Sequence, residues 1–242
     1  MADERAQQVH RVLVVVAHPD DVDFGSGGTI AGWIDAGLEV SYCIVTDGDA
    51  GGIDPAVPRS AIGVIRQDEQ RKAATALGVT DVEFLGYPDG RLMVSFELRR
   101  DITRVIRRAR PDRMVIPSPH RDLRSVYASH PDHQAAGEAA LCAIYPDARN
   151  PFAHPELLAE EGLEAHTVPE VWVMSSNAQA DHYVDITDTF DRKIAALRAH
   201  ASQTAHMTTL EERMRGWGSM QAQAAGLPAG RLAEGYLVLD TA

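Results

Sequence analysis

The sequence is poor in cysteine and has no long hydrophobic run, internal repeat or low-complexity tract. Its two cysteines, Cys43 and Cys142, lie among apolar residues, which excludes a disulfide framework and predicts two buried thiols. No stretch approaches the roughly 18 apolar residues of a membrane span, and the charged stretch MADERAQQVHR does not resemble a signal peptide. We therefore expect a cytoplasmic protein, because free thiols are typical of a reducing compartment.

Basic residues are also scarce relative to acidic ones. The chain carries 23 lysines and arginines against 35 aspartates and glutamates, which gives a formal net charge of -12 at pH 7. A negative balance of this size repels phosphate backbones and anionic lipid surfaces. We therefore expect no nucleic acid partner and no membrane partner.

What the sequence does contain is a regular alternation of strand-like and helix-like segments. The continuous β-branched run RVLVVVAH is typical of a strand that is buried on both faces. Helical patterns and short apolar runs then alternate as far as YVDITDTFDRKIAALRAHASQ, which runs from strand into helix. This alternation predicts an α/β fold with a mostly parallel, doubly wound sheet and helices on both faces.

The same pattern predicts a single domain over residues 1–242. Residues 1–10 are expected to form a flexible tail. The longest weakly patterned stretch, residues 146–168, is followed by no second core pattern. We therefore predict that this stretch is a surface excursion near the site rather than a linker between domains.

Titratable side chains follow four of the predicted strands at the points where those strands end. In chain order, these residues include His18, Asp20, Asp21, Asp47, Asp49, Asp89, His130, Asp132 and His133. Open parallel sheets bind ligands at the carboxyl ends of their strands. Four polar clusters at one edge of a sheet therefore predict a functional site.

Two short motifs, AHPDD and SHPDH, carry the residue types of a metal site. The first places His18 three residues before Asp21, and the second places His130 three residues before His133. Two histidines and one carboxylate form a common set of metal ligands that leaves positions open for water and substrate. We predict His18, Asp21 and His133 as the ligands. Asp20 and His130 would lie beside the metal, where they could move protons to and from an activated water.

Each motif alone has a plainer explanation. HPDD by itself is typical of a capped turn, and HPDH by itself is typical of a helix N-terminus with surface histidines. Their joint occurrence at strand ends of one predicted sheet favours the metal site. The glycine-rich GSGGTIAG has imperfect spacing for a dinucleotide loop, and tight packing of strand against helix explains its glycines.

These motifs, together with GSGGTIA, VTDGDAGG, RQDEQRKAATALGV and FLGYPDG, resemble those of the LmbE-like (PIG-L) zinc-dependent N-acetylglucosaminyl deacetylases. That family includes the mycothiol- and bacillithiol-type deacetylases, and the resemblance covers nearly the whole chain. It implies a Rossmann-like fold and a hydrolase that removes an N-acetyl group from an amino sugar or a related small-molecule conjugate. It also implies a Zn²⁺ cofactor, with Fe²⁺ as the alternative, and a homo-oligomer.

The resemblance assigns roles to the first motif. His18 and Asp21, with His133, match the family's zinc ligands, and Asp20 matches its general base. Val22 stands where the family often has a glutamate, and because that position is not a ligand we expect only an indirect effect.

The second motif and two further positions also match. His130 matches the general acid or electrostatic stabiliser, and Asp132 the residue that orients it, while Arg66 and Asp89 match positions that contact substrate hydroxyls. Ala128 stands where mycothiol-type members have a tyrosine that stabilises the oxyanion. We therefore do not assign to this sequence either the oxyanion-stabilising tyrosine or a mycothiol precursor as substrate.

Three other functions fit parts of the same pattern. A conjugate amidase that cleaves a larger acyl group is the nearest, because the sequence does not set the volume of the pocket. A non-catalytic sugar- or metal-binding module would not need Asp20, His130 or Asp132. A non-haem iron oxygenase uses the same ligand types, but usually in β-rich barrels rather than at parallel strand ends.

Overall fold

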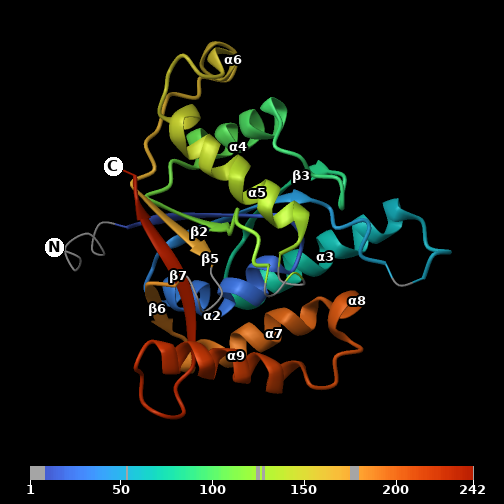
Figure 1. The fold of residues 1–242 in the computed structure, drawn as a ribbon. Helices are drawn as coiled ribbons and strands as arrows, with labels where there is room; N and C mark the ends of the chain where they lie inside the picture. Colours follow the sequence, from blue (N-terminus) through green and yellow to red (C-terminus); the bar gives the residue numbers. More distant parts are fainter. Residues whose placement is uncertain (1–8, 53, 124–125, 127–128, 175–179, 242) are drawn as a thin grey trace.

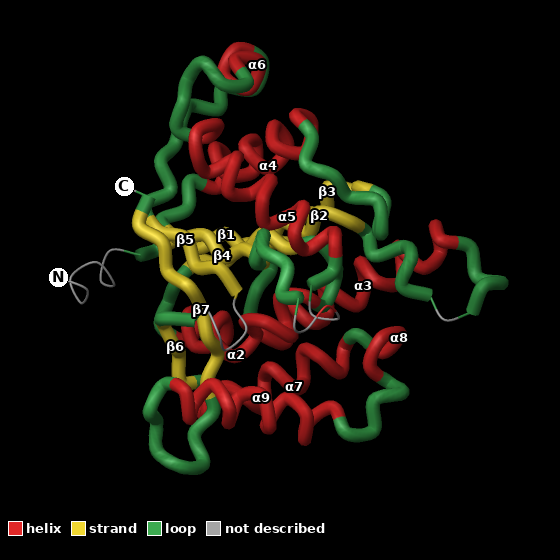
Figure 2. The backbone as a smooth tube through the Cα atoms, in the orientation of Figure 1, coloured by secondary structure: helices red, strands yellow, loops and turns green. Residues whose placement is uncertain are grey.

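The computed structural model describes residues 9–52, 54–123, 126, 129–174 and 180–241. Its strands are β1 (Arg11–Val16), β2 (Glu39–Thr46), β3 (Asp81–Tyr87), β4 (Arg113–Pro117), β5 (Glu170–Met174), β6 (His182–Asp185) and β7 (Ala233–Asp240). Within the described residues they form one seven-stranded sheet of order β3-β2-β1-β4-β5-β7-β6 (Figure 1, Figure 2). Strands β1 to β5 pair in parallel, whereas β7 is antiparallel to both β5 and β6. The predicted mostly parallel sheet is confirmed.

Helices cover both faces of this sheet, as predicted. They are α2 (Asp21–Asp35), α3 (Arg59–Leu77), α4 (Phe96–Ala109), α5 (Pro131–Cys142), the π-helical segment η2 (Ala143–Ala148), α6 (Pro155–Ala159), the 3₁₀ turn η3 (Thr187–Thr189), α7 (Phe190–Ala199), α8 (Ala201–Thr204) and α9 (Leu210–Ala224). Helices α4 and α5 lie on one face, while α2, α3 and α7 lie on the other, with α9 outside them (Figure 1).

Strand β1 shows why the sequence has a continuous apolar run. Val12, Val14 and Val16 pack in the core beneath α2 and α3, and Leu13 and Val15 pack in the core beneath α4 and α5. Successive side chains of a strand point to opposite faces. A central strand with helices on both sides must therefore be apolar at every position.

The strand order places a topological switch point at the end of β1. From β1 the chain builds outward to β2 and β3, and it then returns to add β4 on the other side of β1. Open α/β sheets bind ligands at such a switch point, outside the carboxyl ends of the strands. His18 follows β1 and His133 follows β4, so residues 115 positions apart in the sequence lie on the two sides of this point.

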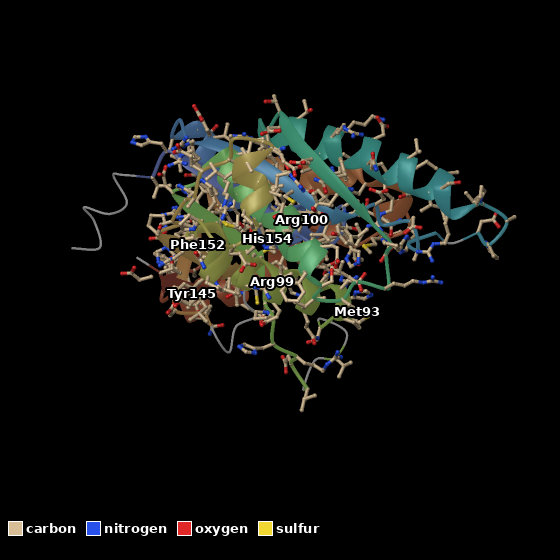
Figure 3. All side chains as sticks on the ribbon, turned by 90° about the horizontal axis from the view of Figure 1, so that it is seen from above. Met93, Arg99, Arg100, Tyr145, Phe152 and His154 are labelled. Carbon is tan, nitrogen blue, oxygen red and sulfur yellow. The ribbon has the colours of Figure 1, made fainter. Side chains whose placement is uncertain are left out.

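Residues 146–168 lie against α4 rather than near the polar strand ends, where the sequence predicted them. The twelve residues of α5 advance the chain by about 18 Å before this stretch begins. Arg107 of α4, which is 2% exposed, donates to carbonyls of the stretch, including that of Asn150. The ring of His166 bonds to the Pro111 carbonyl, just before β4 begins. Figure 3 looks down on this side of the molecule.

Other sequence-level expectations have mixed outcomes. Cys43 is buried and Cys142 is half-buried, both as free thiols, so the prediction of two buried thiols holds only for Cys43. Across the described ranges, the helices are all too short or too polar to cross a bilayer. Residues 1–8 of the expected flexible tail lie outside the described residues.

A buried ion pair connects the last strand to the helix that begins at the site. Lys193 of α7 donates to Glu234 of β7 over 2.5 Å, and both residues are 5% exposed. Glu234 also accepts the backbone N–H groups of Gly28 and Thr29 in the middle of α2. Lys193 donates to the Phe24 carbonyl, which in a regular helix would accept from Gly28. The pair therefore ties α7 and β7 to α2.

We predict that this ion pair is important for stability. Lys193→Met leaves the Glu234 carboxylate buried without its counter-charge, so the free energy of unfolding should fall by about 3–5 kcal/mol in urea denaturation. The matched control is Arg198→Met, which removes an exposed ion pair of the same helix with Glu211. It should lower the same quantity by less than about 1 kcal/mol. Equal losses in the two variants would contradict the prediction.

Candidate metal centre

The turn after β1 directs two predicted ligands toward one point. His18 is 7% exposed, and its backbone N–H donates to Asp21 Oδ2 over 2.8 Å. Asp20 lies between them with a left-handed backbone, φ 93°, and α2 begins directly after it. This tight strand-to-helix turn brings the Asp21 carboxylate back toward the ring of His18.

The three predicted ligands come together with the spacing of a metal site. His133 Nε2 lies 2.9 Å from Asp21 Oδ1 and 3.1 Å from His18 Nδ1, and His18 Nδ1 lies 3.5 Å from Asp21 Oδ2. Nitrogen and oxygen ligands at 2.0–2.2 Å from a tetrahedral ion are about 3.3 Å apart. The separations of these atoms fall on both sides of that value, so the three side chains could hold a divalent metal with little movement.

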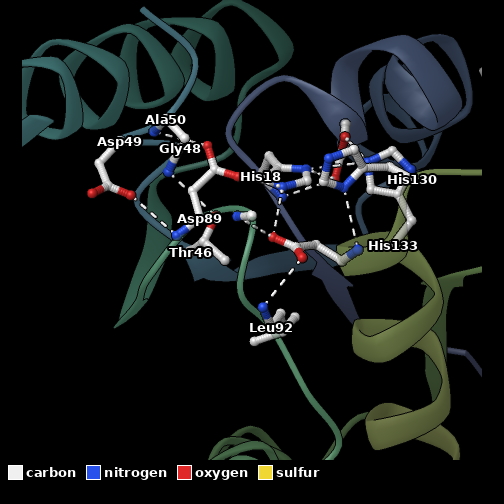
Figure 4. A network of polar contacts seen from close by, with 12 residues as sticks. His18, Thr46, Gly48, Asp49, Ala50, Asp89, Leu92, His130 and His133 are labelled. Atoms are coloured by element: carbon white, nitrogen blue, oxygen red, sulfur yellow. Dashed lines mark hydrogen bonds and ion pairs between the residues drawn. The ribbon is translucent and has the colours of Figure 1, made fainter.

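A second set of possible ligands lies on the other edge of the His18 ring. His18 Nε2 is 3.0 Å from Asp89 Oδ1 and 3.3 Å from Asp132 Oδ2, and these three side chains could also hold an ion. His130 is close enough to His18 and His133 to be a further candidate ligand. Figure 4 shows the His18 ring between Asp89 on one side and the two other rings on the other side.

The surroundings of Asp132 and Asp89 favour an orienting role for both carboxylates. Asp132 accepts the backbone N–H groups of Gly90 and Leu92, and Asp89 accepts that of Ala50 (Figure 4). Metal-binding histidines usually donate their other ring N–H to a carboxylate, which fixes the tautomer and raises the basicity of the ligating nitrogen. With Asp89 and Asp132 at Nε2, the nitrogen left for a metal is His18 Nδ1, which faces Asp21 and His133.

The electrostatics of the cluster favour a bound cation. Burial lowers the pKa of His18, but the charge of Asp21 and hydrogen bonds to Asp132, Asp21 and Asp89 outweigh it and raise this pKa to about 12. Burial raises the pKa of Asp21, yet the charges of His133 and His18 hold it well below its ordinary value. A field that stabilises an imidazolium so strongly would also stabilise a divalent metal at the same point.

Asp20, the predicted general base, lies beside this cluster and is paired with Arg66. Burial raises the pKa of Asp20 to about 6, against the opposing charge of Arg66. Arg66 Nη2 is 2.9 Å from Asp20 Oδ2 and also donates to the carbonyl of Pro19, while Nη1 donates to the carbonyl of Gly48. Arg66, which is 4% exposed, therefore contacts Asp20 and backbone carbonyls, and the contact with substrate hydroxyls that the resemblance implies stays a prediction.

His130 is held by the backbone of Asp132 rather than by its carboxylate. The backbone N–H of Asp132 donates to His130 Nδ1 over 3.2 Å, at the first turn of α5. A ring nitrogen that accepts a hydrogen bond carries no proton, so the proton of the ring is on Nε2. Burial, and then the charge of His18, lower the pKa of His130. In this arrangement His130 accepts through Nδ1 and can donate through Nε2.

Three buried residues of the site region had no predicted role in catalysis. Gln70 of α3 donates to Asp23 and accepts the backbone N–H of Asp20, and His200 also bonds to Asp23. The signal for Gln70 was present in α3, where buried positions recur with helical spacing. Arg66 and Gln70 are polar residues within that apolar stripe. Ala128, where the family's tyrosine would be, lies outside the described residues.

The fold and the site together define a class of protein. It is a Rossmann-like α/β protein with histidines and carboxylates gathered at the switch point of the sheet. Residues 13–144 match the PIG-L family, described as GlcNAc-PI de-N-acetylase. Since this match covers more than half of the 242 residues, the chain belongs to the PIG-L family, as the motifs predicted.

Relatives of this chain are N-acetyl deacetylases of amino sugars. A diacetylchitobiose deacetylase of Thermococcus kodakarensis is 33% identical over 83% of this chain and 73% of its own length. A 1D-myo-inositol 2-acetamido-2-deoxy-α-D-glucopyranoside deacetylase of Kineococcus radiotolerans is 29% identical over 83% of this chain and 70% of its own length. The structure of N,N'-diacetylchitobiose deacetylase from Pyrococcus horikoshii superposes with a TM-score of 0.89 at 30% identity. That superposition covers 98% of this chain and 86% of the other.

We predict that two substitutions will show which ring nitrogen of His18, Nδ1 or Nε2, binds the metal. His133→Ala removes a ligand atom on the Nδ1 side, so the purified variant should lose its divalent metal. Asp132→Asn removes a charge on the Nε2 side, so the variant should keep the metal with an affinity about 10–100-fold weaker. Elemental analysis after dialysis and titration with a competing chelator measure both quantities. The reverse pattern would place the metal at Nε2, with Asp89 and Asp132.

Proposed function

We propose that this protein is a metal-dependent hydrolase that removes the N-acetyl group from an acetylated amino sugar or a related glycoconjugate. The observation that carries the proposal is the grouping of His18, Asp21 and His133 beside Asp20 at the switch point of a PIG-L fold. Zn²⁺ is the proposed metal, since two imidazoles and one carboxylate with an open position are typical of catalytic zinc sites. Fe²⁺ is the alternative for the same ligands.

In this proposal the chain's own residues divide the chemistry between them. A divalent metal held there would acidify a water molecule and polarise the amide carbonyl. Asp20 removes a proton from the attacking water, and a pKa of about 6 suits it to accept a proton near neutral pH. His130 donates a hydrogen bond from Nε2 to the oxygen that gains negative charge as the carbonyl carbon becomes tetrahedral.

The bond from carbon to nitrogen then breaks, and the leaving amine needs a proton. The hydrogen bond that His130 Nδ1 accepts favours a stabilising role over an acid role for this ring. Asp20 therefore returns to the amine nitrogen the proton that it took from water. The products are the free amino sugar and acetic acid, which ionises to acetate by giving its proton to the amine or to solvent, and Asp20 is again a carboxylate. Asp89 and Arg66 contribute by holding His18 and Asp20, respectively.

We predict that Asp20→Asn will keep the metal and lose turnover. The amide cannot accept the proton of water, so kcat for acetate release should fall by about 100-fold or more while the metal content stays at the wild-type level. Asp35→Asn is the matched control, because Asp35 is an exposed carboxylate at the far end of α2, the helix that begins directly after Asp20. Its kcat should equal that of the wild type. A metal-replete Asp20→Asn variant with near wild-type kcat would exclude Asp20 as the base.

A panel of acylated amino sugars tests the substrate class. The metal-loaded protein is given N-acetylglucosamine conjugates and their N-propionyl and longer analogues, and the freed amine is measured. A pocket closed around a methyl group should reject an added methylene by about tenfold or more in kcat/KM. Faster release of longer acyl groups would instead identify a conjugate amidase. Metal and sugar binding without any release of amine would identify a non-catalytic module.

Assembly and location complete the proposal. We propose a homo-oligomer in the cytoplasm, with a small-molecule substrate as its main partner. The two free thiols support a reducing compartment. Light scattering on the purified protein measures the oligomeric state.

A further inference from the structure

The backbone of Asp20 has a conformation that needs support from its surroundings. Its φ is 93°, in the left-handed region that residues with a Cβ atom rarely adopt. Such a conformation persists only where neighbouring groups hold it. The Asp20 carbonyl accepts the N–H groups of Asp23 and Phe24, which belong to the first turn of α2. Its own N–H donates to Gln70 Oε1 over 2.8 Å, and this hydrogen bond joins residues 50 positions apart in the sequence.

The amide of Gln70 is itself fixed in one orientation. Asp20 offers an N–H, so Gln70 must present its oxygen there and turn its Nε2 the other way. Nε2 donates to Asp23 Oδ2 over 3.0 Å, and the same oxygen is 2.8 Å from His200 Nε2. His200 is the C-cap residue that directly follows α7. A chain of hydrogen bonds therefore runs from the Asp20 backbone through α3 and α2 to the end of α7.

This chain of hydrogen bonds is closed to solvent. Gln70, Asp23 and His200 each have no exposed surface. Bulk water therefore cannot take over a hydrogen bond when one partner is removed, and the loss leaves a buried polar group unpaired. Arg66, one turn earlier on α3, holds the Asp20 carboxylate, so α3 holds Asp20 through both its backbone and its side chain.

We propose that Gln70 is a positioning residue for Asp20, and that Asp23 and His200 hold the Gln70 amide in the orientation that this requires. The inference rests on the proposed function, because it concerns the carboxylate assigned as general base. Without Gln70 the backbone of Asp20 can return to negative φ, and this rotation moves the carboxylate away from its place beside Asp21. A displacement of about 1 Å at a reacting group can lower a rate by about 100-fold.

The first test is Gln70→Leu, which keeps the approximate volume and removes both polar ends. We expect kcat for acetate release to fall by about 10–100-fold, with KM and metal content unchanged. Glu69→Gln is the matched control, since Glu69 is buried on the same helix but bonds to Ser202 of α8. It should leave kcat unchanged. A purely structural role would lower the amount of folded protein in both variants without a selective loss of kcat.

The second test reverses the polarity of one hydrogen bond, and it serves also if Gln70→Leu fails to fold. Gln70→Glu can still accept from Asp20 but sets a carboxylate against that of Asp23, so kcat should fall. Adding Asp23→Asn supplies a donor to the new carboxylate. His200 Nδ1 has no hydrogen-bond partner among the described residues, so its ring can move its proton there and accept at Nε2. The double variant should regain most of the kcat that Gln70→Glu lost.

A crystal structure separates this inference from the proposed function. If wild-type protein releases no acetate from any amino sugar, the proposed function fails, but the backbone of Asp20 in the Gln70→Leu variant can still be observed. Asp20 at negative φ with a displaced carboxylate supports the positioning role. An unchanged Asp20, an unchanged kcat in folded and metal-replete Gln70→Leu, or no recovery in the double variant would overturn it.

Discussion

The site depends on one arrangement of opposite charges, in which the Asp21 carboxylate contacts the rings of both His18 and His133. Each of these groups would resist burial alone, because a charge without a partner is costly to remove from water. Together they make burial acceptable and create a point at which a cation is favoured. The sheet makes this possible, since the switch between β1 and β4 brings two distant parts of the chain together at one edge of the sheet.

Around this centre, other polar groups are held rather than free. Asp89 and Asp132 are fixed by backbone N–H groups before they reach His18. Asp20 is held by Arg66 and by Gln70. Because side chains that are already ordered lose little entropy when a substrate binds, such a site is prepared for reaction before the substrate arrives. The rigid elements β1, α2, α3 and α5 supply this order.

Much of the fold could be predicted from the sequence, because strong periodic signals decide it locally. The continuous apolar run of β1 indicated burial on both faces, and the HPDD and HPDH motifs identified the residues that meet at the switch point. The orientation of each histidine ring could not be predicted, because it depends on contacts with residues far away in the sequence. The ring of His18, for example, is oriented by Asp89 and Asp132, which both contact its Nε2 atom. The position of residues 146–168 was missed for a similar reason. Backbone carbonyls of this stretch accept hydrogen bonds from Arg107 of α4, and the sequence of the stretch itself does not indicate that contact.

The ion pair of Lys193 and Glu234 has a consequence for biosynthesis. Glu234 belongs to the last strand, yet it bonds to the middle of the helix that starts at Asp21 near the beginning of the chain. The N-terminal residues leave the ribosome first, so α2 can bond to Glu234 only after almost all of the polypeptide has emerged. A nascent or truncated chain without β7 lacks the carboxylate that accepts from Gly28 and Thr29, so α2 is joined to α7 and β7 only when the last strand is in place.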